Sequence, residues 1–398
     1  MARLSLKKKN AKPCDFLMLV LTVILVIFGI GMVFSASYYK ALNSPSGSPF
    51  TYLEKQGVFA LIGAVIIYVC SYLDYHLWQR YSLVILAIAV ALLVLVLLIG
   101  TNVNGAKRWI YIGPISIMPG EIAKFAMICF MSAYFSGSPD RAKLKGLIIP
   151  VILTLGVAGL IILQPNLSTA ITVCGIVFGM AFIAGLHWGY IVGLLGAGAA
   201  AFVVLANSGT YWAARITSFQ NPFKDSSGDG WQAVQSLLAL GTGGLSGLGI
   251  GKSIQKNLYL PEPQNDFILA IIGEELGLIG ILVLLLVFAL LIWRCLRTAI
   301  KAPDRFGMLM ASGVGVMIGL QVILNVAVVT SSMPPTGVAL PFISYGGNSL
   351  WIFMGSVGIL LNISRQIDEA PKEDPAKRRL RMRREARQAA RARRTEYL

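Results

Sequence analysis

Apolar stretches long enough to cross a membrane recur along almost the whole chain. They lie at 16–37, 56–73, 81–100, 117–136, 146–163, 167–186, 189–207, 267–293, 306–330 and 346–363. A helix of roughly 20 apolar residues crosses the hydrocarbon core of a bilayer, and a helix satisfies its own backbone hydrogen bonds there. The pattern therefore predicts an all-α, polytopic membrane protein with about ten transmembrane helices.

The polar segments divide the chain into few parts. We expect a basic N-terminal tail at 1–14, one membrane domain at 15–365 and a basic C-terminal tail at 366–398. A loop at 208–266 joins the seventh and eighth spans, and a loop of this length is uncommon unless it has a function. Only 13% of the residues are charged, which is about half the usual share of a soluble domain. No large soluble domain is therefore predicted.

Positive charge indicates which side of the membrane each loop faces. An even number of spans places four basic segments on one side: the two tails, a loop with Arg141, Lys143 and Lys145, and a loop with Arg294, Arg297, Lys301 and Arg305. Short loops rich in Lys and Arg stay in the cytoplasm. We therefore expect both termini in the cytoplasm and the 208–266 loop outside. The C-terminal tail directly follows a span, which favours anionic lipid headgroups over nucleic acid as its partner.

A second set of cations lies on the opposite face. They are Lys107 and Arg108 in a loop at 101–116, and Arg215, Lys224, Lys252 and Lys256 in the 208–266 loop. One explanation is that long loops escape the positive-inside bias. The other is an outer surface that binds an anionic ligand, and we favour it because these cations share a face with Asp266.

Ionisable residues in or beside the spans are candidates for chemistry, because burying charge in lipid is costly. Glu121 and Lys124 share one helix face, so they form either a neutralising pair or part of a polar cavity that meets an anionic group. Asp266 ends the long loop. It is either an N-cap or a general base whose pKa is raised by partial burial. Glu274 and Glu275 point away from Asp266 on the same helix, so we expect them to pack or to form hydrogen bonds.

Several familiar site patterns fail in this sequence. Gly251-Lys252-Ser253 lacks the glycine that a phosphate-binding loop requires at the position of Ser246. His76 and His187 offer no zinc spacing. The glycines of 241–251 fit either a tightly turned loop or close approach of the backbone to a ligand.

Five stretches of the membrane domain form a specific combination. They are Asn104 to Ile110 (NGAKRWI), Pro119 to Lys124 (PGEIAK), Arg215 to Ser236, Gly241 to Gly277 with Tyr259-Leu260-Pro261-Glu262 and Asp266-Phe267-Ile268, and Pro341 to Gly347 (PFISYGG). Through them the chain resembles the SEDS family (shape, elongation, division and sporulation), which contains FtsW, RodA and SpoVE. The resemblance covers about residues 15–365.

The resemblance implies a fold, an activity and partners. Members of the SEDS family are peptidoglycan glycosyltransferases that polymerise lipid II, an undecaprenyl-pyrophosphate-linked disaccharide-pentapeptide, at the outer face of the cytoplasmic membrane. They work with a class B penicillin-binding protein, which crosslinks the glycan, and with other membrane proteins of the division or elongation machinery. We therefore expect a SEDS fold and a role in cell-wall synthesis during cell division, with Asp266 as the catalytic residue.

The resemblance also implies a substrate site. Its candidates are Lys107, Arg108, Glu121, Lys124, Asn166, Arg215, Gln232, Gln235, Lys256 and Glu262. Asp266 would take the proton of the acceptor hydroxyl, and the cations would stabilise the charge that grows on the leaving pyrophosphate. A divalent cation, Mg²⁺ or Mn²⁺, could share that task, although the sequence shows no dedicated metal cage.

Three positions depart from the family pattern. Asn166 stands where the family has an aspartate, and it cannot ionise. Gly120 replaces a serine next to Glu121, and Ser331-Ser332 replace a glycine and an aliphatic residue. These changes leave open a divergent member with altered activity.

Two other functions fit the same resemblance, a lipid II flippase and a non-catalytic scaffold of the division or elongation machinery. A transporter needs polar residues near the membrane midplane and a path open to both faces. The polar residues here gather on the outer face, and Asp266 lies at the edge of its span, which favours the enzyme. An intact Asp266 also weighs against the scaffold, whereas Asn166 weighs for it.

Overall fold

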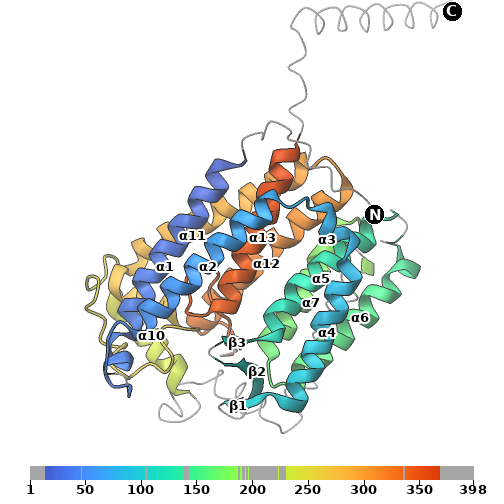
Figure 1. Ribbon diagram of the computed structural model, residues 1–398. Coiled ribbons are helices and arrows are strands. Elements are labelled where there is room, and N and C mark those ends of the chain that lie inside the picture. The colour runs from blue at the N-terminus through green and yellow to red at the C-terminus, as the bar shows by residue number, and fades with distance from the viewer. Residues whose placement is uncertain are drawn as a thin grey trace, which may run out of the picture.

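The computed structural model describes residues 14–45, 47–103, 106–113, 115–138, 143–186, 230–334 and 337–367, with a few single residues between them. Helices dominate this part of the chain (Figure 1). Six are long and apolar enough to cross a membrane: α1 (Phe16–Leu42), α2 (Thr51–Tyr72), α4 (Ser82–Ile99), α11 (Ile268–Lys301), α12 (Arg305–Val329) and α13 (Gly347–Gln366). Three further helices are α5 (Pro119–Ser136) and the shorter, apolar α6 (Ile148–Ile162) and α7 (Leu167–Ile183).

These nine helices coincide with nine of the ten predicted spans, and the prediction of a mostly helical, multi-pass membrane protein is confirmed. The remaining predicted span, 189–207, lies almost entirely outside the described residues. Three short helical elements occupy connections: α3 (His76–Arg80), the 3₁₀ helix η2 (Leu144–Leu147) and α10 (Trp231–Gly243). The last of these shows that the long loop has secondary structure of its own.

One detail differs from the prediction, because a small antiparallel sheet occupies the expected loop at 101–116. Its strands are β1 (Thr101–Val103), β2 (Ala106–Ile112) and β3 (Ile115–Ile117), paired in the order β1-β2-β3. Asn102 pairs with Lys107, and Tyr111 pairs with Ser116. Aromatic and β-branched residues in β2 favour a strand, and Asn-Gly is a favoured two-residue connection between antiparallel strands.

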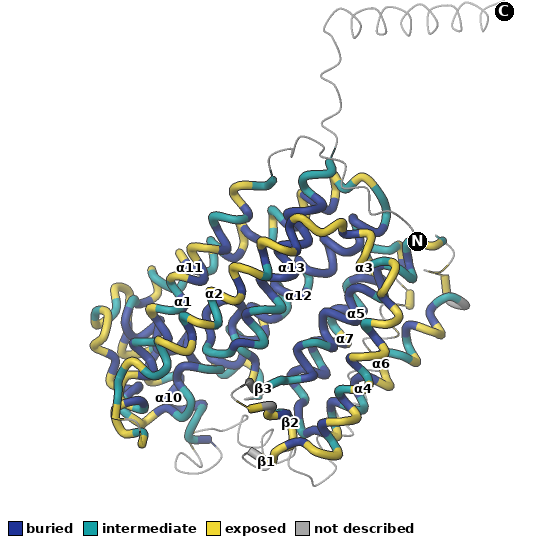
Figure 2. Tube along the Cα trace, viewed as in Figure 1, coloured by how far each residue is buried: buried dark blue, intermediate teal, exposed yellow. Residues whose placement is uncertain are grey.

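The most buried helices lie in the middle of the bundle. Buried positions run along α5, α7, α12 and α13, whereas exposed positions mark α2, α4 and α6 (Figure 2). α2 packs on α13, α1 and α12 pack on α11, and α5 contacts α4, α7 and α12. The outer helices expose large apolar side chains such as Leu61, Val65 and Leu98, as expected of surfaces that face lipid.

The two ends of the bundle differ in what they carry. At one end, Asp15 before α1 donates its backbone N–H to Ser364 Oγ in α13 at 3.0 Å, and Arg294 Nε donates to the Asp15 carboxylate at 2.8 Å. The sheet and α10 lie at the opposite end (Figure 1). The start of the first span and the end of the last therefore share one end, as an even number of spans requires.

Helix α11 is broken at Gly277, whose φ of 68° lies in the left-handed region. The glycine-rich segment 241–251 inserts at this break, and Gly247 is required because a Cβ there would lie 2.2 Å from the Glu275 carbonyl. Four backbone hydrogen bonds join the segments: Leu278 N to Gly244 O (2.9 Å), Ile279 N to Leu245 O (3.1 Å), Leu248 N to Glu274 O (2.9 Å) and Gly249 N to Glu275 O (3.0 Å). They replace the helical hydrogen bonds that the break removes. These glycines therefore allow the backbone of 241–251 to approach α11 closely. In the described residues this close contact is with the protein's own helix and not with a ligand.

Candidate functional site

Asp266 lies at the end of the long loop, just before α11, and is half-buried. The N-cap of α11 is Phe267, and no side chain caps this helix, so the explanation of Asp266 as an N-cap is wrong. Its carbonyl oxygen accepts a hydrogen bond of 2.8 Å from Asn325 Nδ2 in α12. Asn325 is fully buried and also donates to Val338 O at 2.7 Å. This one side chain ties the end of the loop to the segment that follows α12.

That segment, residues 337–346, runs along the end of the long loop. Ser344 Oγ donates to Asn265 O at 2.7 Å, and Tyr345 N donates to Gln264 O at 2.9 Å. Together with Asn325, these contacts fix the backbone of 264–266. Burial raises the pKa of the Tyr345 phenol to about 12, with a smaller contribution from Tyr52. Tyr345 therefore stays protonated near neutral pH and is no candidate for a base.

Gly337 lies directly against the Asp266 carboxylate. Its φ of +76° is left-handed, and a Cβ at this position would stand 3.0 Å from Asp266 Oδ2. Ser168 Oγ donates to Gly337 O at 3.4 Å. The first turn of α7 therefore lies close to Asp266. This proximity is not evident from the sequence, in which the two segments are about 100 residues apart.

The turn between α6 and α7 carries the first family departure. Asn166 is the N-cap of α7, with its Oδ1 accepting from Thr169 N at 3.3 Å. The guanidinium of Arg108, from β2, donates to Gln164 O at 3.3 Å and to Pro165 O. Arg108 therefore holds the backbone of this turn from the side of the sheet.

Glu121 and Lys124 form a buried ion pair in α5. Lys124 Nζ lies 2.7 Å from Glu121 Oε1, and the two side chains are 1% and 8% exposed. Nζ also lies 6.0 Å from the centre of the Phe353 ring. Both alternatives that the sequence left open, a neutralising pair and part of a polar cavity, included this pairing. Among the described residues the pair is buried and does not face an open cavity.

The departures at 120 and 166 are neighbours in space. A Cβ added to Gly120 would lie 3.1 Å from Thr169 Cγ2 and 3.8 Å from Asn166 Nδ2. That amide nitrogen is buried and has no hydrogen-bond partner in the described part of the chain. A serine hydroxyl at 120 and an aspartate carboxylate at 166, as in the family pattern, would stand side by side, and this chain has neither group.

The third departure lies at the C-terminal end of α12. Ser331 has a φ of +50°. Ser331 N donates to Val328 O at 3.0 Å and Ser332 N donates to Ala327 O at 2.7 Å, the pattern of a Schellman motif. Glycine adopts this conformation freely, and serine does so at a cost of roughly 1 kcal/mol. The change therefore weakens a helix end rather than the chemistry of the site.

Lys256, a predicted substrate ligand, is engaged inside the protein. It is 3% exposed, and its Nζ lies 2.8 Å from Glu275 Oε1 and 3.0 Å from Ser35 Oγ. Glu274 is equally internal, since it accepts hydrogen bonds from the backbone N–H of Ile254 at 3.0 Å and of Gln255 at 3.2 Å. The expectation that Glu274 and Glu275 form structural hydrogen bonds is confirmed.

Glu262, in the segment that precedes Asp266, contacts the end of α1. Its carboxylate pairs with Lys40 and accepts hydrogen bonds of 2.9 Å from Gln264 Nε2 and from Asn265 Nδ2. The side chains of Lys40 and Glu262 remain 32% and 44% exposed. This pair therefore braces the loop while staying open to solvent.

The other predicted ligands are spread over the same end of the bundle. Lys107 is exposed on β2, Gln232 is half-buried on α10, and Gln235 is buried there. Arg215 lies outside the described residues. No group of three or more His, Cys, Asp or Glu side chains within the described residues is arranged to hold a metal ion, so the divalent cation stays a prediction.

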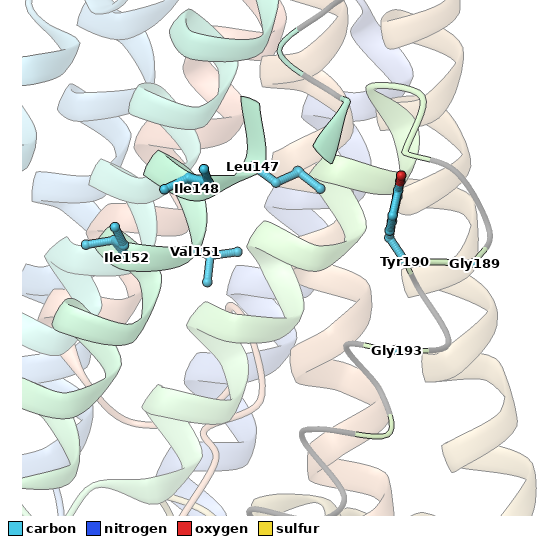
Figure 3. Close-up of a pocket in the computed structure, with 7 residues that line it drawn as sticks. All are labelled: Leu147, Ile148, Val151, Ile152, Gly189, Tyr190 and Gly193. Atoms are coloured by element: carbon cyan, nitrogen blue, oxygen red, sulfur yellow. The ribbon is translucent and has the colours of Figure 1, made fainter. Parts of the chain in front are cut away.

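An apolar pocket of about 410 Å³ lies away from these residues (Figure 3). It is lined by Leu147, Ile148, Val151, Ile152, Gly189, Tyr190 and Gly193. Ile148, Val151 and Ile152 belong to the first turns of α6, whereas Gln164, which Arg108 contacts, lies beyond its last turn. Among the described residues that line it, Tyr190 alone has a polar side chain, and the pocket is not part of the candidate site.

Comparison with known proteins places this arrangement in a family. A family model described as cell cycle protein, for FtsW, RodA and SpoVE, matches residues 15–369. Stage V sporulation protein E of Bacillus subtilis (strain 168) is 42% identical over 361 residues, which cover 90% of this chain and 98% of that protein. A protein of Trichlorobacter lovleyi named probable peptidoglycan glycosyltransferase FtsW is 41% identical over 365 residues, which cover 90% and 94%.

Solved structures agree with the sequence matches. A chain from a peptidoglycan synthase complex that coordinates polymerization and crosslinking superposes with a TM-score of 0.74 at 28% identity, over 89% of this chain and 99% of that one. The rod shape determining protein RodA of Thermus thermophilus superposes with a TM-score of 0.67 at 27% identity, over 91% and 100%. The chain belongs to the SEDS family of FtsW, RodA and SpoVE.

Proposed function

We propose that this chain is a peptidoglycan glycosyltransferase that polymerises lipid II, with Asp266 as its general base. The observation that supports this most directly is the position of Asp266. Its half-buried carboxylate stands at one end of the bundle, on a backbone that Asn325 and Ser344 hold in place. A general base must be fixed within reach of the proton that it removes, and an end of the bundle is where a lipid-linked sugar is accessible.

The proposed reaction is a displacement at the anomeric carbon of the donor sugar. The acceptor hydroxyl oxygen attacks that carbon, and the glycosidic bond forms as the bond to the pyrophosphate oxygen breaks. The hydroxyl proton passes to the Asp266 carboxylate. The electron pair of the broken bond leaves on the lipid pyrophosphate, whose added charge needs stabilisation.

The cations at this end do not all have the same role in the proposal. Lys107 is exposed on β2 and is the described cation best suited to the pyrophosphate oxygens. Arg108 and Lys124 already have protein partners. We therefore propose that they stabilise the structure of the site and contribute to its charge without binding the substrate directly. Arg215, Gln232 and Glu262 stay proposed substrate ligands.

Restoring the family aspartate, Asn166→Asp, is expected to raise the rate of polymerisation several-fold. Aspartate caps a helix as well as asparagine does, the start of α7 stabilises its charge, and the buried unpaired Asn166 Nδ2 disappears. Initial rates of glycan formation from labelled lipid II measure the change. Asn43→Asp, at an exposed position of the same end, should have no effect. A rate that stays equal or falls in Asn166→Asp would mean that the asparagine is no handicap.

Adding one methyl group at Gly337 is expected to lower kcat by about tenfold or more, or ~1.4 kcal/mol in the barrier. In Gly337→Ala, the new Cβ would lie 3.0 Å from Asp266 Oδ2 and would displace the carboxylate. Gly47→Ala is the matched control, because Gly47 also has a left-handed φ (+61°) but has no atom within 4 Å of its Cβ position. Equal rates in the two variants would show that Gly337 does not seat the base.

We further propose that the Asp266 end faces the outside of the cytoplasmic membrane and that both termini are cytoplasmic. The basic loops lie at the other end, in agreement with the positive-inside rule. In a background without the native cysteines, Asn43→Cys should react with an impermeant maleimide added to intact cells, and Arg80→Cys should react only after lysis. The reverse pattern would invert the orientation.

The test of the polymerase uses the purified full chain, labelled lipid II and a class B penicillin-binding protein as the proposed partner. Glycan chains should appear on a gel. No polymer from a folded, assembled complex would refute the proposal. Translocation of lipid II in proteoliposomes, unchanged by Asp266→Ala, would identify a flippase instead. If the protein shows neither polymerisation nor translocation, the scaffold is the function that remains.

A further inference from the structure

Residues 244–259, which we name the apolar shelf, expose large apolar side chains outside the spanning helices. Ile250 is 73% exposed, Leu245 is 70% exposed and Leu258 is 62% exposed, and Ile254 and Tyr259 are also exposed. Single exposed apolar residues are ordinary, but a cluster of this kind marks a surface that contacts something other than water.

The apolar shelf is a fixed structure. Four backbone hydrogen bonds attach its first part to the break in α11. Its middle is held by Glu274, which accepts from Ser253 Oγ and from the N–H of Ile254 and Gln255. Near its end, Trp231 Nε1 donates to Tyr259 O at 2.7 Å. The exposed side chains are therefore presented by an anchored backbone and keep their positions relative to the bundle.

The break in α11 indicates how deep the shelf lies. α11 has 34 residues and a length of roughly 51 Å, which exceeds the ~30 Å of the hydrocarbon core. Counted from Arg294 at the basic end, about 20 residues cross that core and lead to Glu274 and Glu275. The shelf is attached at this level, which is the boundary between acyl chains and headgroups.

The shelf also continues the surface that α11 offers to lipid. Leu278, Ile279 and Leu282, just beyond the break, are 47%, 59% and 55% exposed. The N–H groups of Leu278 and Ile279 are bonded to the shelf itself. The lipid-facing side of α11 and the apolar side chains of 244–259 are thus adjacent parts of one surface.

We propose that the apolar shelf lies in the membrane interface at the Asp266 end, with Leu245, Ile250 and Leu258 among the acyl chains of that leaflet. Lys252 is exposed on the shelf and is placed to contact lipid phosphates. Tyr259 and Trp231 are of the residue types that prefer this depth. The shelf thereby sets the height of Asp266, seven residues after Tyr259, above the acyl chains from which a lipid-linked substrate approaches.

The experiment measures depth and does not depend on the proposed catalytic activity. Single cysteines at Ile250 and, separately, at Leu245 carry a nitroxide label in the full chain, reconstituted in phosphatidylcholine–phosphatidylglycerol vesicles. Collisions with oxygen, which concentrates in the acyl chains, are compared with collisions with a water-soluble nickel chelate. Leu282→Cys on α11 supplies the lipid reference, and Asn43→Cys supplies the aqueous reference at the same end.

We expect the ratio of oxygen to nickel accessibility at 250 and 245 to match the label at 282 and to exceed the label at 43 several-fold. Labels at both shelf positions that behave like the label at 43 would overturn the proposal. Labels that are shielded from both reagents would also overturn it, because they would indicate a second copy of the chain, or another part of it, seated on the shelf.

Discussion

Replacing Asp266 by asparagine is expected to lower the rate of glycan polymerisation by about 10²–10⁴-fold, the usual contribution of a general base. The amide has nearly the shape of the carboxylate but cannot take up the proton of the acceptor hydroxyl. The loss should fall on kcat, with KM for lipid II little changed, because the carboxylate acts in the transition state. Initial rates with purified protein, partner transpeptidase and labelled lipid II measure both.

The control for this variant is Asp74→Asn. Asp74 is an exposed carboxylate at the opposite end of the bundle, where it accepts a hydrogen bond from His76 N at 3.0 Å. The thermal midpoint of Asp266→Asn should stay close to that of the parent, because the amide has nearly the shape of the carboxylate and the backbone contact with Asn325 is kept. A polymerisation rate within a few-fold of both the parent and the control would exclude Asp266 as the base.

The predicted spans agree with the structure because each spanning helix needs its own run of about 20 apolar residues. Such a run is visible in the local sequence alone. The 101–117 sheet is a different case. β2 is only seven residues long and has a lysine and an arginine at its second and third positions, so these charged residues conceal the strand signal. The Asn-Gly at 104–105 between two short runs was the available sign of a hairpin.

The catalytic candidate was recognisable in the sequence, but the residues that position it were not. Asn325 looks like one polar residue in an apolar span, and its two acceptors are Asp266, 59 residues earlier, and Val338, 13 residues later. Gly337 matters only because the Asp266 carboxylate packs on it. Contacts of this kind depend on how separate helices assemble, which spacing within one segment does not encode.

The cations at the Asp266 end of the bundle show the same limit in a different way. Their shared face suggested one anion-binding surface, yet Arg108 and Lys256 are turned toward protein acceptors and Lys107 is exposed. A positively charged residue in a loop at this end is therefore compatible with a role inside the fold. Which role a given lysine has follows from its partners, and for Lys256 these are 19 and 221 residues away.

Replacing Lys256 by methionine is accordingly expected to destabilise the fold by about 3–5 kcal/mol, the usual cost of removing one partner of a buried ion pair. Glu275 has no exposed surface, and without Lys256 its charge would be left with Ser35 alone among the contacts described above. Thermal unfolding in detergent should show a midpoint lower by several degrees. Lys252→Met, in the same segment but exposed, should unfold like the parent.

The double variant Lys256→Met/Glu275→Leu separates a structural role of Lys256 from substrate binding. Replacing both members of a buried pair by apolar residues is often neutral, so most of the lost stability should return, and polymerisation should return with it. A double variant that is stable but inactive would place Lys256 among the substrate ligands after all. Recovery of both properties would show that Lys256 serves to neutralise Glu275 where Lys256, Ser35 and Glu275 join the long loop, α1 and α11, and that substrate binding does not require it.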